Sequence, residues 1–240
     1  MSGPLSLITA ALLKGRCQVC LTPVPAAAGP LCGNCDALLP LRQGGYCPRC
    51  GICYADASAP PYLCLNCRIS PPPWSALAFY APYAGLLKEL IHGYKFGHDH
   101  GLGFLLRHLM VRAWEAHGLH PPDRVVPVPM RSGKVLARGF NQSVELARML
   151  CSAFGFALCS DGLRKIRPTR PQFSLRRAAR RENVAGAFAA PSMKGLRVLL
   201  VDDVATTGAT LSACARACLD AGAAISHIPS SSSDAFLPYA

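Results

Sequence analysis

The sequence predicts an α/β protein in which a mostly parallel sheet is flanked by helices and preceded by a small cysteine-rich domain. Eight cysteines form four Cys-x-x-Cys pairs within residues 17–67. Prolines at positions 71–73 separate this segment from the rest of the chain. Beyond them, short apolar runs typical of buried strands alternate with segments of helical periodicity. That alternation is characteristic of a parallel sheet with crossover helices.

The composition is that of a globular protein with room for one medium domain and one small domain. Of the 240 residues, 51% are hydrophobic and 16% are charged, which is enough apolar material for a sizeable core. The net charge of +12 indicates an anionic partner. It does not choose among a nucleotide, a nucleic acid and a membrane surface.

The N-terminal residues 4–14 are predicted to form a short amphipathic helix. The apolar run at 5–13 is too short to span a bilayer, and its charges, Lys14 and Arg16, follow it instead of preceding it as in a signal peptide. We therefore expect a soluble cytoplasmic protein whose thirteen cysteines are not disulfides.

The cysteine pairs have the spacing of metal ligands. They are Cys17 with Cys20, Cys32 with Cys35, Cys47 with Cys50, and Cys64 with Cys67. Two Cys-x-x-Cys turns complete a four-thiolate zinc site, whose binding free energy replaces the core that about fifty residues cannot build. The sequence thus predicts two structural Zn²⁺ ions. By default we expect consecutive pairs to share an ion, although the spacing leaves an interleaved pairing open. Redox chemistry is the alternative function of Cys-x-x-Cys pairs.

The domain boundaries follow from these features. We predict an N-terminal helix with the cysteine-rich domain at 1–68, a proline-rich linker at 69–75, the second domain at 76–229 and a C-terminal tail at 230–240.

The first half of the second domain begins with a predicted strand at 76–80. Apolar residues then recur at helical spacing over 86–95, and a second helix is expected at 102–117, ended by two prolines. Residues 124–129 are predicted as a strand leading into a rigid turn, followed by a helix over 141–151.

The segment 164–181 holds eight lysines and arginines and no acid. Like charges at this density repel one another, so we expect a mobile loop that becomes ordered over an anion. A solvated basic surface is the alternative. A short strand is predicted next, at 186–189.

The most informative stretch is an apolar run at 198–201, two acids, Asp202 and Asp203, and a hydroxyl-rich turn. The run reads as a buried parallel strand, 211–222 as a helix and 223–228 as a final strand. At such a junction, the free N–H groups of the helix bind phosphate, helped by the hydroxyls of Thr206, Thr207 and Thr210. The carboxylates suit ribose hydroxyls or Mg²⁺. This arrangement resembles the 5-phosphoribosyl-1-pyrophosphate (PRPP) motif of type I phosphoribosyltransferases.

An ordered series of motifs along the chain resembles the ComF family. The series consists of the four cysteine pairs, residues 127–129 with 138–142, residues 169–188, and residues 202–210. The resemblance implies an N-terminal double zinc ribbon and a type I phosphoribosyltransferase fold. It also implies a link to natural competence, the handling of incoming single-stranded DNA.

The resemblance also implies roles for individual residues. Asp202 and Asp203 would take the ribose hydroxyls, and the turn from residue 127 to Arg131 would be the pyrophosphate loop, which such sites can build with a strained or cis peptide. Residues 164–183 would cover the site, and Lys95 would reach the same anion. The implied ligand-binding residues are Lys95, Pro127, Val128, Pro129, Val204, Ala205, Thr206, Thr207, Gly208, Ala209 and Thr210.

The sequence leaves hypotheses from different functional classes open. In the first, the protein is a phosphoribosyltransferase (a pentosyltransferase) that uses PRPP with Mg²⁺; Arg131, Lys134 and loop arginines stabilise the departing pyrophosphate. In the second, a non-catalytic module binds single-stranded DNA or DNA-uptake proteins and uses the phosphoribosyl site as a sensor. A third is a zinc domain that only docks proteins. No segment indicates an acceptor substrate.

Overall fold

The computed structural model describes most of the chain. The described residues are 15–25, 29–96, 101–130, 133, 135–136, 139–169, 177–205 and 208–233, without the side chains of 177–178, 180–181 and 225–233. The helix expected at 4–14, the residues Arg131, Lys134, Thr206 and Thr207, and the C-terminal tail from 234 lie outside these ranges.

The centre of the molecule is a parallel sheet. Its strand order is β1-β6-β5-β2, and every neighbouring pair in it is parallel. The strands are β1 (Ala76–Pro82), β2 (Arg124–Pro127), β5 (Arg197–Ala205) and β6 (Ala224–Ser233). A second, antiparallel pair joins β3 (Arg164–Lys165) to β4 (Phe188–Ala189). The predicted α/β class with a mostly parallel sheet is confirmed.

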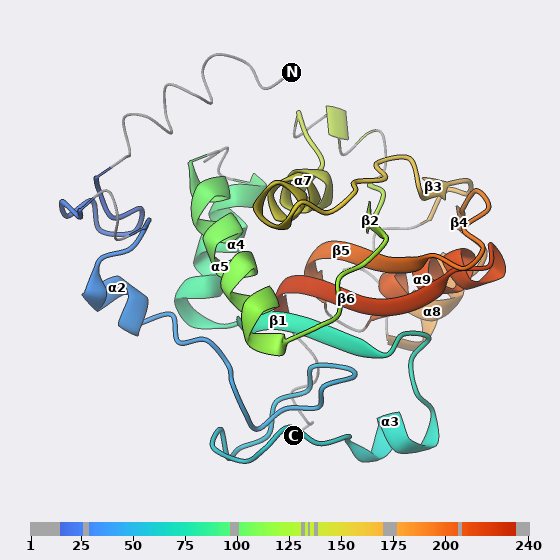
Figure 1. Cartoon of the computed structure of the whole chain (residues 1–240), viewed down its shortest axis with the longest axis horizontal. Coiled ribbons are helices and arrows are strands. Elements are labelled where there is room, and N and C mark those ends of the chain that lie inside the picture. Colours follow the sequence, from blue (N-terminus) through green and yellow to red (C-terminus); the bar gives the residue numbers. More distant parts are fainter. Residues whose placement is uncertain are drawn as a thin grey trace.

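Helices cover both faces of the sheet (Figure 1). Helices α4 (Gly85–Phe96), α5 (Leu102–His117) and α7 (Gln142–Phe154) pack on one face, against Leu199 and Val201 of β5. Helices α8 (Arg177–Val184) and α9 (Ala209–Asp220) pack on the other, against Val198 and Leu200. Successive residues of β5 therefore enter opposite cores, which explains why the strand reads as an unbroken apolar run.

Some elements differ in extent from the sequence prediction. Strand β6 continues to Ser233, beyond the predicted end at 228. The basic segment is not a loop throughout, because residues 177–184 form α8. Arginine, alanine and glutamate are good helix formers, so local propensity outweighs charge repulsion there. Within the described ranges, no helix is both long and apolar enough to cross a membrane.

The cysteine-rich segment packs along β1, which is an edge strand of the sheet (Figure 1). The N–H of Arg42 donates to the carbonyl of Tyr80 at 2.8 Å, and the N–H of Leu77 donates to the carbonyl of Pro48, also at 2.8 Å. An uncovered edge strand offers unpaired backbone groups to other chains. The cysteine-rich segment thus covers an edge that would otherwise be open.

Trp74, in the predicted linker, joins the two parts of the chain. It is only 5% exposed, and its indole N–H donates to the carbonyl of Arg49 at 2.6 Å. Its ring also lies against Gly208, where an added Cβ would meet the ring at 3.4 Å. The linker is therefore part of the packed interior at this position.

Candidate functional site

Strand β5 places two adjacent acids next to the start of a helix. Residues 198–201 of the strand are completely buried, and Asp202 and Asp203 follow them directly. Gly208 has φ +67° and is the residue from which α9 begins. A left-handed conformation is accessible to glycine at little cost, so Gly208 permits the sharp turn from strand to helix.

The described part of this turn forms a small pocket of about 20 Å³. Residues that the sequence assigned to ligand binding line it together with one of the acids. The lining residues are Asp202, Val204, Ala205, Gly208, Ala209, Thr210 and Leu211. The turn therefore brings the acid and the N-terminus of α9 to one place.

Lys95 reaches the acid pair from a distant part of the sequence. It lies in the last turn of α4, and its Nζ is 2.9 Å from Oδ2 of Asp203. Each of the two side chains is only 15% exposed, so the pair is shielded from water. The predicted contact of Lys95 with a bound anion stays a prediction, but the structure places its ammonium group beside the acids.

Asp202 is held by two donors on one oxygen. The Ser143 hydroxyl donates to its Oδ1 at 3.0 Å, and the N–H of Asp203 donates to the same atom at 3.0 Å. Burial and, to a smaller extent, the neighbouring Asp203 charge raise the pKa of Asp202 to about 7, although Lys95 and these hydrogen bonds partly oppose the rise. A carboxyl poised near neutral pH is typical of a ligand-binding or catalytic position.

The predicted pyrophosphate loop follows the neighbouring strand. Pro127 ends β2 opposite Val201 of β5, and the N–H of Val128 donates to the Val201 carbonyl at 2.9 Å. The loop therefore starts where the acids lie, at the carboxyl ends of the parallel strands. Within the described residues, which end at 130 on this loop, there is no cis peptide bond.

The base of the predicted covering segment is fixed by its own basic side chains. The guanidinium of Arg167 donates to the carbonyls of Asn183 and Ala185 at 3.1 and 2.6 Å, which lie at the C-terminal end of α8. Cations are favourable there because the last carbonyls of a helix lack partners. The intervening residues 170–176 lie outside the described ranges.

The eight predicted cysteine ligands gather in two clusters of four. Cys17, Cys20, Cys32 and Cys35 form one cluster, and Cys47, Cys50, Cys64 and Cys67 form the other. The sulfur atoms of each cluster lie within 4.8 Å of one another. Consecutive pairs thus come together, as the default pairing predicted.

The clusters fit tetrahedral zinc. With Zn–S bonds of about 2.3 Å, two sulfurs of a tetrahedral site lie about 3.8 Å apart. The Sγ atoms of Cys20 and Cys32 are 3.6 Å apart, and those of Cys50 and Cys64 are 3.7 Å apart. All thirteen cysteines lie in the described ranges, and none of them forms a disulfide bond.

Sequence reasoning missed Ser143 and Trp74. Ser143 directly follows a motif that had been noted, and a serine on the buried face of an apolar helix could have indicated a polar partner. Nothing in the sequence indicated that Trp74 would touch Gly208.

Curated relatives resemble the chain over nearly its whole length, although no family model matches it. The protein named "DNA utilization protein YhgH" of Salmonella typhimurium is 34% identical over 217 residues, covering 88% of this chain and 94% of the relative. "Competence protein F" of Haemophilus influenzae is 31% identical over 205 residues, covering 82% and 87%. The chain belongs to the ComF family.

Two solved structures are also similar to this ComF protein. One is a glutamine PRPP amidotransferase from B. subtilis, 24% identical with a TM-score of 0.37. The other is described as the allosteric regulatory enzyme of purine biosynthesis, 23% identical with a TM-score of 0.38. In each comparison 54% of the ComF chain is covered, and it spans only 26% of the other chain.

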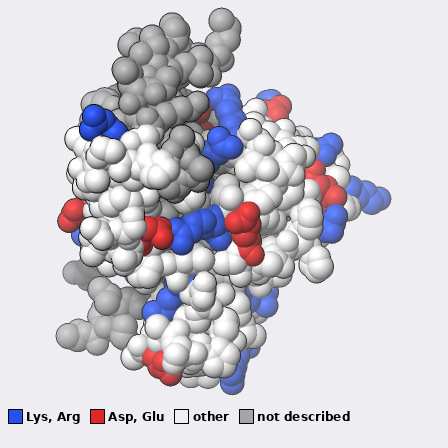
Figure 2. Space-filling model, turned by 60° about the vertical axis from the view of Figure 1, so that its left-hand side comes forward, with Lys and Arg blue, Asp and Glu red and all other residues white. Residues whose placement is uncertain are grey.

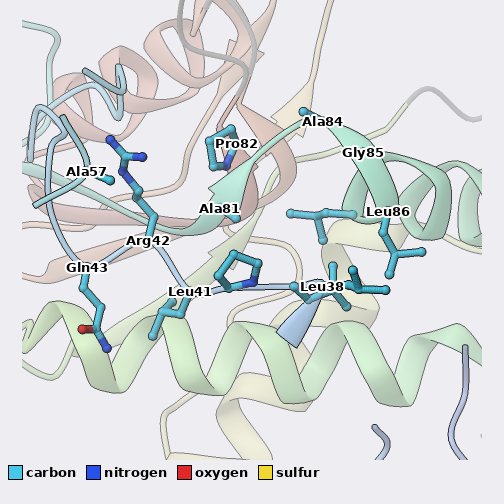
Figure 3. Close-up of a pocket in the computed structure, with 13 residues that line it drawn as sticks. Leu38, Leu41, Arg42, Gln43, Ala57, Ala81, Pro82, Ala84, Gly85 and Leu86 are labelled. Carbon is cyan, nitrogen blue, oxygen red and sulfur yellow. The ribbon is translucent and has the colours of Figure 1, made fainter. Parts of the chain in front are cut away.

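A larger pocket of about 470 Å³ lies away from the acid pair, between the cysteine-rich segment and the start of α4 (Figure 3). Its lining is mostly apolar and includes Leu38, Leu41, Pro82 and Leu86. The guanidinium of Arg42 donates to three carbonyls of the cysteine-rich domain. This pocket thus has few polar groups to orient a ligand, whereas the acid Asp202 lines the smaller pocket at β5.

The positive charge is dispersed over the face of the molecule that Figure 2 shows. Lysines and arginines are separated there by acidic and uncharged side chains, so the described surface in this view presents no continuous basic band. The excess charge of this ComF protein does not by itself mark a nucleic-acid groove on this face.

Proposed function

We propose that this ComF protein binds PRPP and is a phosphoribosyltransferase-like protein. The observation that carries the proposal is the adjacent acid pair at the carboxyl end of β5, just before the Gly208 turn into α9. Ligands of parallel α/β sheets bind at the carboxyl ends of the strands. The same edge holds Lys95 and the start of the predicted pyrophosphate loop.

Each group has a distinct task in this proposal. The N-terminus of α9, with the Thr210 hydroxyl, binds the 5-phosphate because its N–H groups lack helical partners. The carboxylates of Asp202 and Asp203 accept hydrogen bonds from the ribose hydroxyls. Lys95 and Arg131 offset the charge of the pyrophosphate. Mg²⁺, carried by the pyrophosphate as part of the substrate, supplies further charge neutralisation.

The proposed reaction transfers the phosphoribosyl group. An acceptor nucleophile bonds to the anomeric carbon while the bond between that carbon and the pyrophosphate oxygen breaks. Pyrophosphate leaves with the electron pair, and the acceptor loses a proton. Positioning and electrostatic stabilisation of the leaving group are the contributions expected from the protein.

We further propose that the protein acts in DNA uptake or use and carries two structural zinc ions. The first suggestion rests on the names of its relatives, which refer to DNA utilization and competence. The second rests on the two clusters of four cysteines. A reducing compartment keeps cysteine thiols available to zinc, which favours the cytoplasm.

Titration calorimetry with PRPP and Mg²⁺ tests the proposal. Wild type is expected to bind, and the Asp202→Asn/Asp203→Asn variant is expected to lose at least about tenfold in affinity, since two charged acceptors are removed. Asp161 and Asp220 are exposed acids elsewhere in the described structure. The Asp161→Asn/Asp220→Asn variant, which changes the net charge equally, should bind like wild type. Equal binding by the two variants would refute the site.

Pyrophosphate release then tests catalysis. Purine bases, pyrimidine bases and small amines serve as acceptors, and release by wild type above that of the Asp202→Asn/Asp203→Asn variant is the expected result. PRPP binding without pyrophosphate release, whichever acceptor is added, would instead favour the sensor hypothesis.

The second candidate function is a non-catalytic module that binds single-stranded DNA and senses PRPP. The net charge of +12 supports it, because phosphate neutralisation gives affinity that falls steeply with salt. Anisotropy of a labelled single-stranded oligonucleotide at low and at physiological salt tests it. No binding at low salt would exclude this candidate.

A further inference from the structure

We infer that Ser143 is a positioning residue, which fixes the Asp202 carboxylate so that it can accept hydrogen bonds from the ribose hydroxyls of a phosphoribosyl ligand. This inference rests on the proposed function and adds a group from α7 to the site. Ser143 itself is not expected to touch the ligand.

The hydrogen bonds of Asp202 define an orientation. Ser143 Oγ and the N–H of Asp203 both donate to Oδ1, each at 3.0 Å. Within the described residues, Oδ2 of Asp202 has no hydrogen-bond partner. One oxygen of the carboxylate is therefore held by the protein, and the other is available to a donor from outside.

Ser143 is itself rigidly placed. It lies in the first turn of α7 and is only 4% exposed. Its backbone N–H donates to the Asn141 side-chain oxygen at 3.0 Å, which caps the helix. The Asn141 amide in turn donates to the carbonyl of Val128 at 3.2 Å. A group held by a capped helix, by Asp202 of β5 and, through Asn141, by the residue that follows β2 loses little orientation when a ligand binds.

These contacts join both predicted halves of the site. Val128 belongs to the predicted pyrophosphate loop, and Asp202 belongs to the acid pair. The N-terminal end of α7 contacts both, through the N-cap Asn141 and through Ser143, so it sets the spacing between them. A hydroxyl is needed at position 143 because an alkyl side chain cannot donate to a carboxylate.

Two probes that share little chemistry test this role. Ribose 5-phosphate carries the ribose hydroxyls, whereas inorganic pyrophosphate does not. Ser143→Ala is expected to lower the affinity for ribose 5-phosphate about tenfold, the typical effect of one hydrogen bond to a charged group. Its affinity for pyrophosphate should stay within about twofold of that of wild type. Ser143→Thr, which keeps the hydroxyl, should restore ribose 5-phosphate binding. Ser152→Ala, at an exposed position of the same helix, is the matched control.

The outcomes separate a positioning role from a structural one. Equal weakening of both probes by Ser143→Ala would mean general damage and would overturn the inference. Unchanged binding of ribose 5-phosphate would overturn it as well. Selective loss with rescue by threonine would support it.

Failure of the proposed function is distinguishable from failure of this inference. If wild type binds neither probe nor PRPP, the proposed function fails. The contact is then tested by thermal unfolding of Ser143→Ala, Asp202→Ala and the double variant, since alanine at either position removes the hydrogen bond. Non-additive shifts in Tm would support the positioning contact without any ligand, and additive shifts would overturn it.

Discussion

Replacing Asp202 by asparagine is expected to stabilise the free protein, and increasingly so as the pH rises. The environment of Asp202 raises its pKa from the ordinary 3.8 to about 7. Between these values, the folded protein holds a proton that the unfolded chain has released. The stability supplied by that proton is present at acidic pH and is lost as the pH rises to about 7. Asparagine does not titrate and avoids this loss.

The size of the effect follows from the pKa. One unit corresponds to about 1.4 kcal/mol, so wild type should lose about 2 kcal/mol relative to Asp202→Asn between pH 5.5 and 7. Below this range, protonation of zinc-binding thiolates would add its own effect. For a chain of this size, about 2 kcal/mol corresponds to a change in Tm of about 4 to 8 °C.

Thermal unfolding followed by circular dichroism from pH 5.5 to 8.5 measures this difference. The gap in Tm between Asp202→Asn and wild type should widen up to about pH 7 and then stay constant. Asp220→Asn, an exposed control, should give a gap that does not change with pH. A constant gap for Asp202→Asn would refute the reasoning, because it would mean that burial does not hold a proton on this carboxyl.

Further predictions concern the turn, a buried amide and the metal. Gly208→Ala and Gly155→Ala both place a side chain at positive φ, +67° and +71°, and each should cost about 1 to 2 kcal/mol of stability. Only Gly208→Ala should also weaken PRPP binding. Equal PRPP affinities of the two variants, measured by calorimetry, would contradict this. Gln142 is fully buried, and among the residues that the structure describes neither end of its carboxamide has a hydrogen-bond partner. Gln142→Met should therefore raise the free energy of unfolding by about 1 to 3 kcal/mol, and a lower Tm would contradict this expectation. Elemental analysis should find two zinc ions per chain, and chelation should lower the Tm by more than 10 °C, or roughly 3 kcal/mol; an unchanged Tm would argue against a structural metal.

The local pattern of the fold could be predicted from the sequence because it depends on neighbouring residues. The apolar run before Asp202 indicated a strand buried on both faces, and it packs in both cores. The cysteine spacing indicated which residues form each cluster, since a Cys-x-x-Cys turn directs both sulfurs to one point.

The contacts that complete the site could not be predicted, because they join residues far apart in the chain. Lys95 meets Asp203 across the C-terminal end of α4, and Ser143 meets Asp202 through the start of α7. Their partners depend on how the helices pack on the sheet, which periodicity does not specify. The strand length of β6 was missed for a related reason. Its serines have weak strand propensity, yet they pair with both neighbouring strands.

The two hydrogen bonds between the cysteine-rich segment and β1, in which Arg42 donates and Pro48 accepts, have a consequence for the protein in the cell. A chain whose cysteine clusters fail to acquire metal would leave this strand with free donors and acceptors, and a second such chain could pair with it. Metal shortage would then cause aggregation before any decline in the chemistry of the intact protein. For the same reason, a recombinant fragment that begins at β1 is expected to be insoluble, whereas the full-length chain supplied with zinc is not.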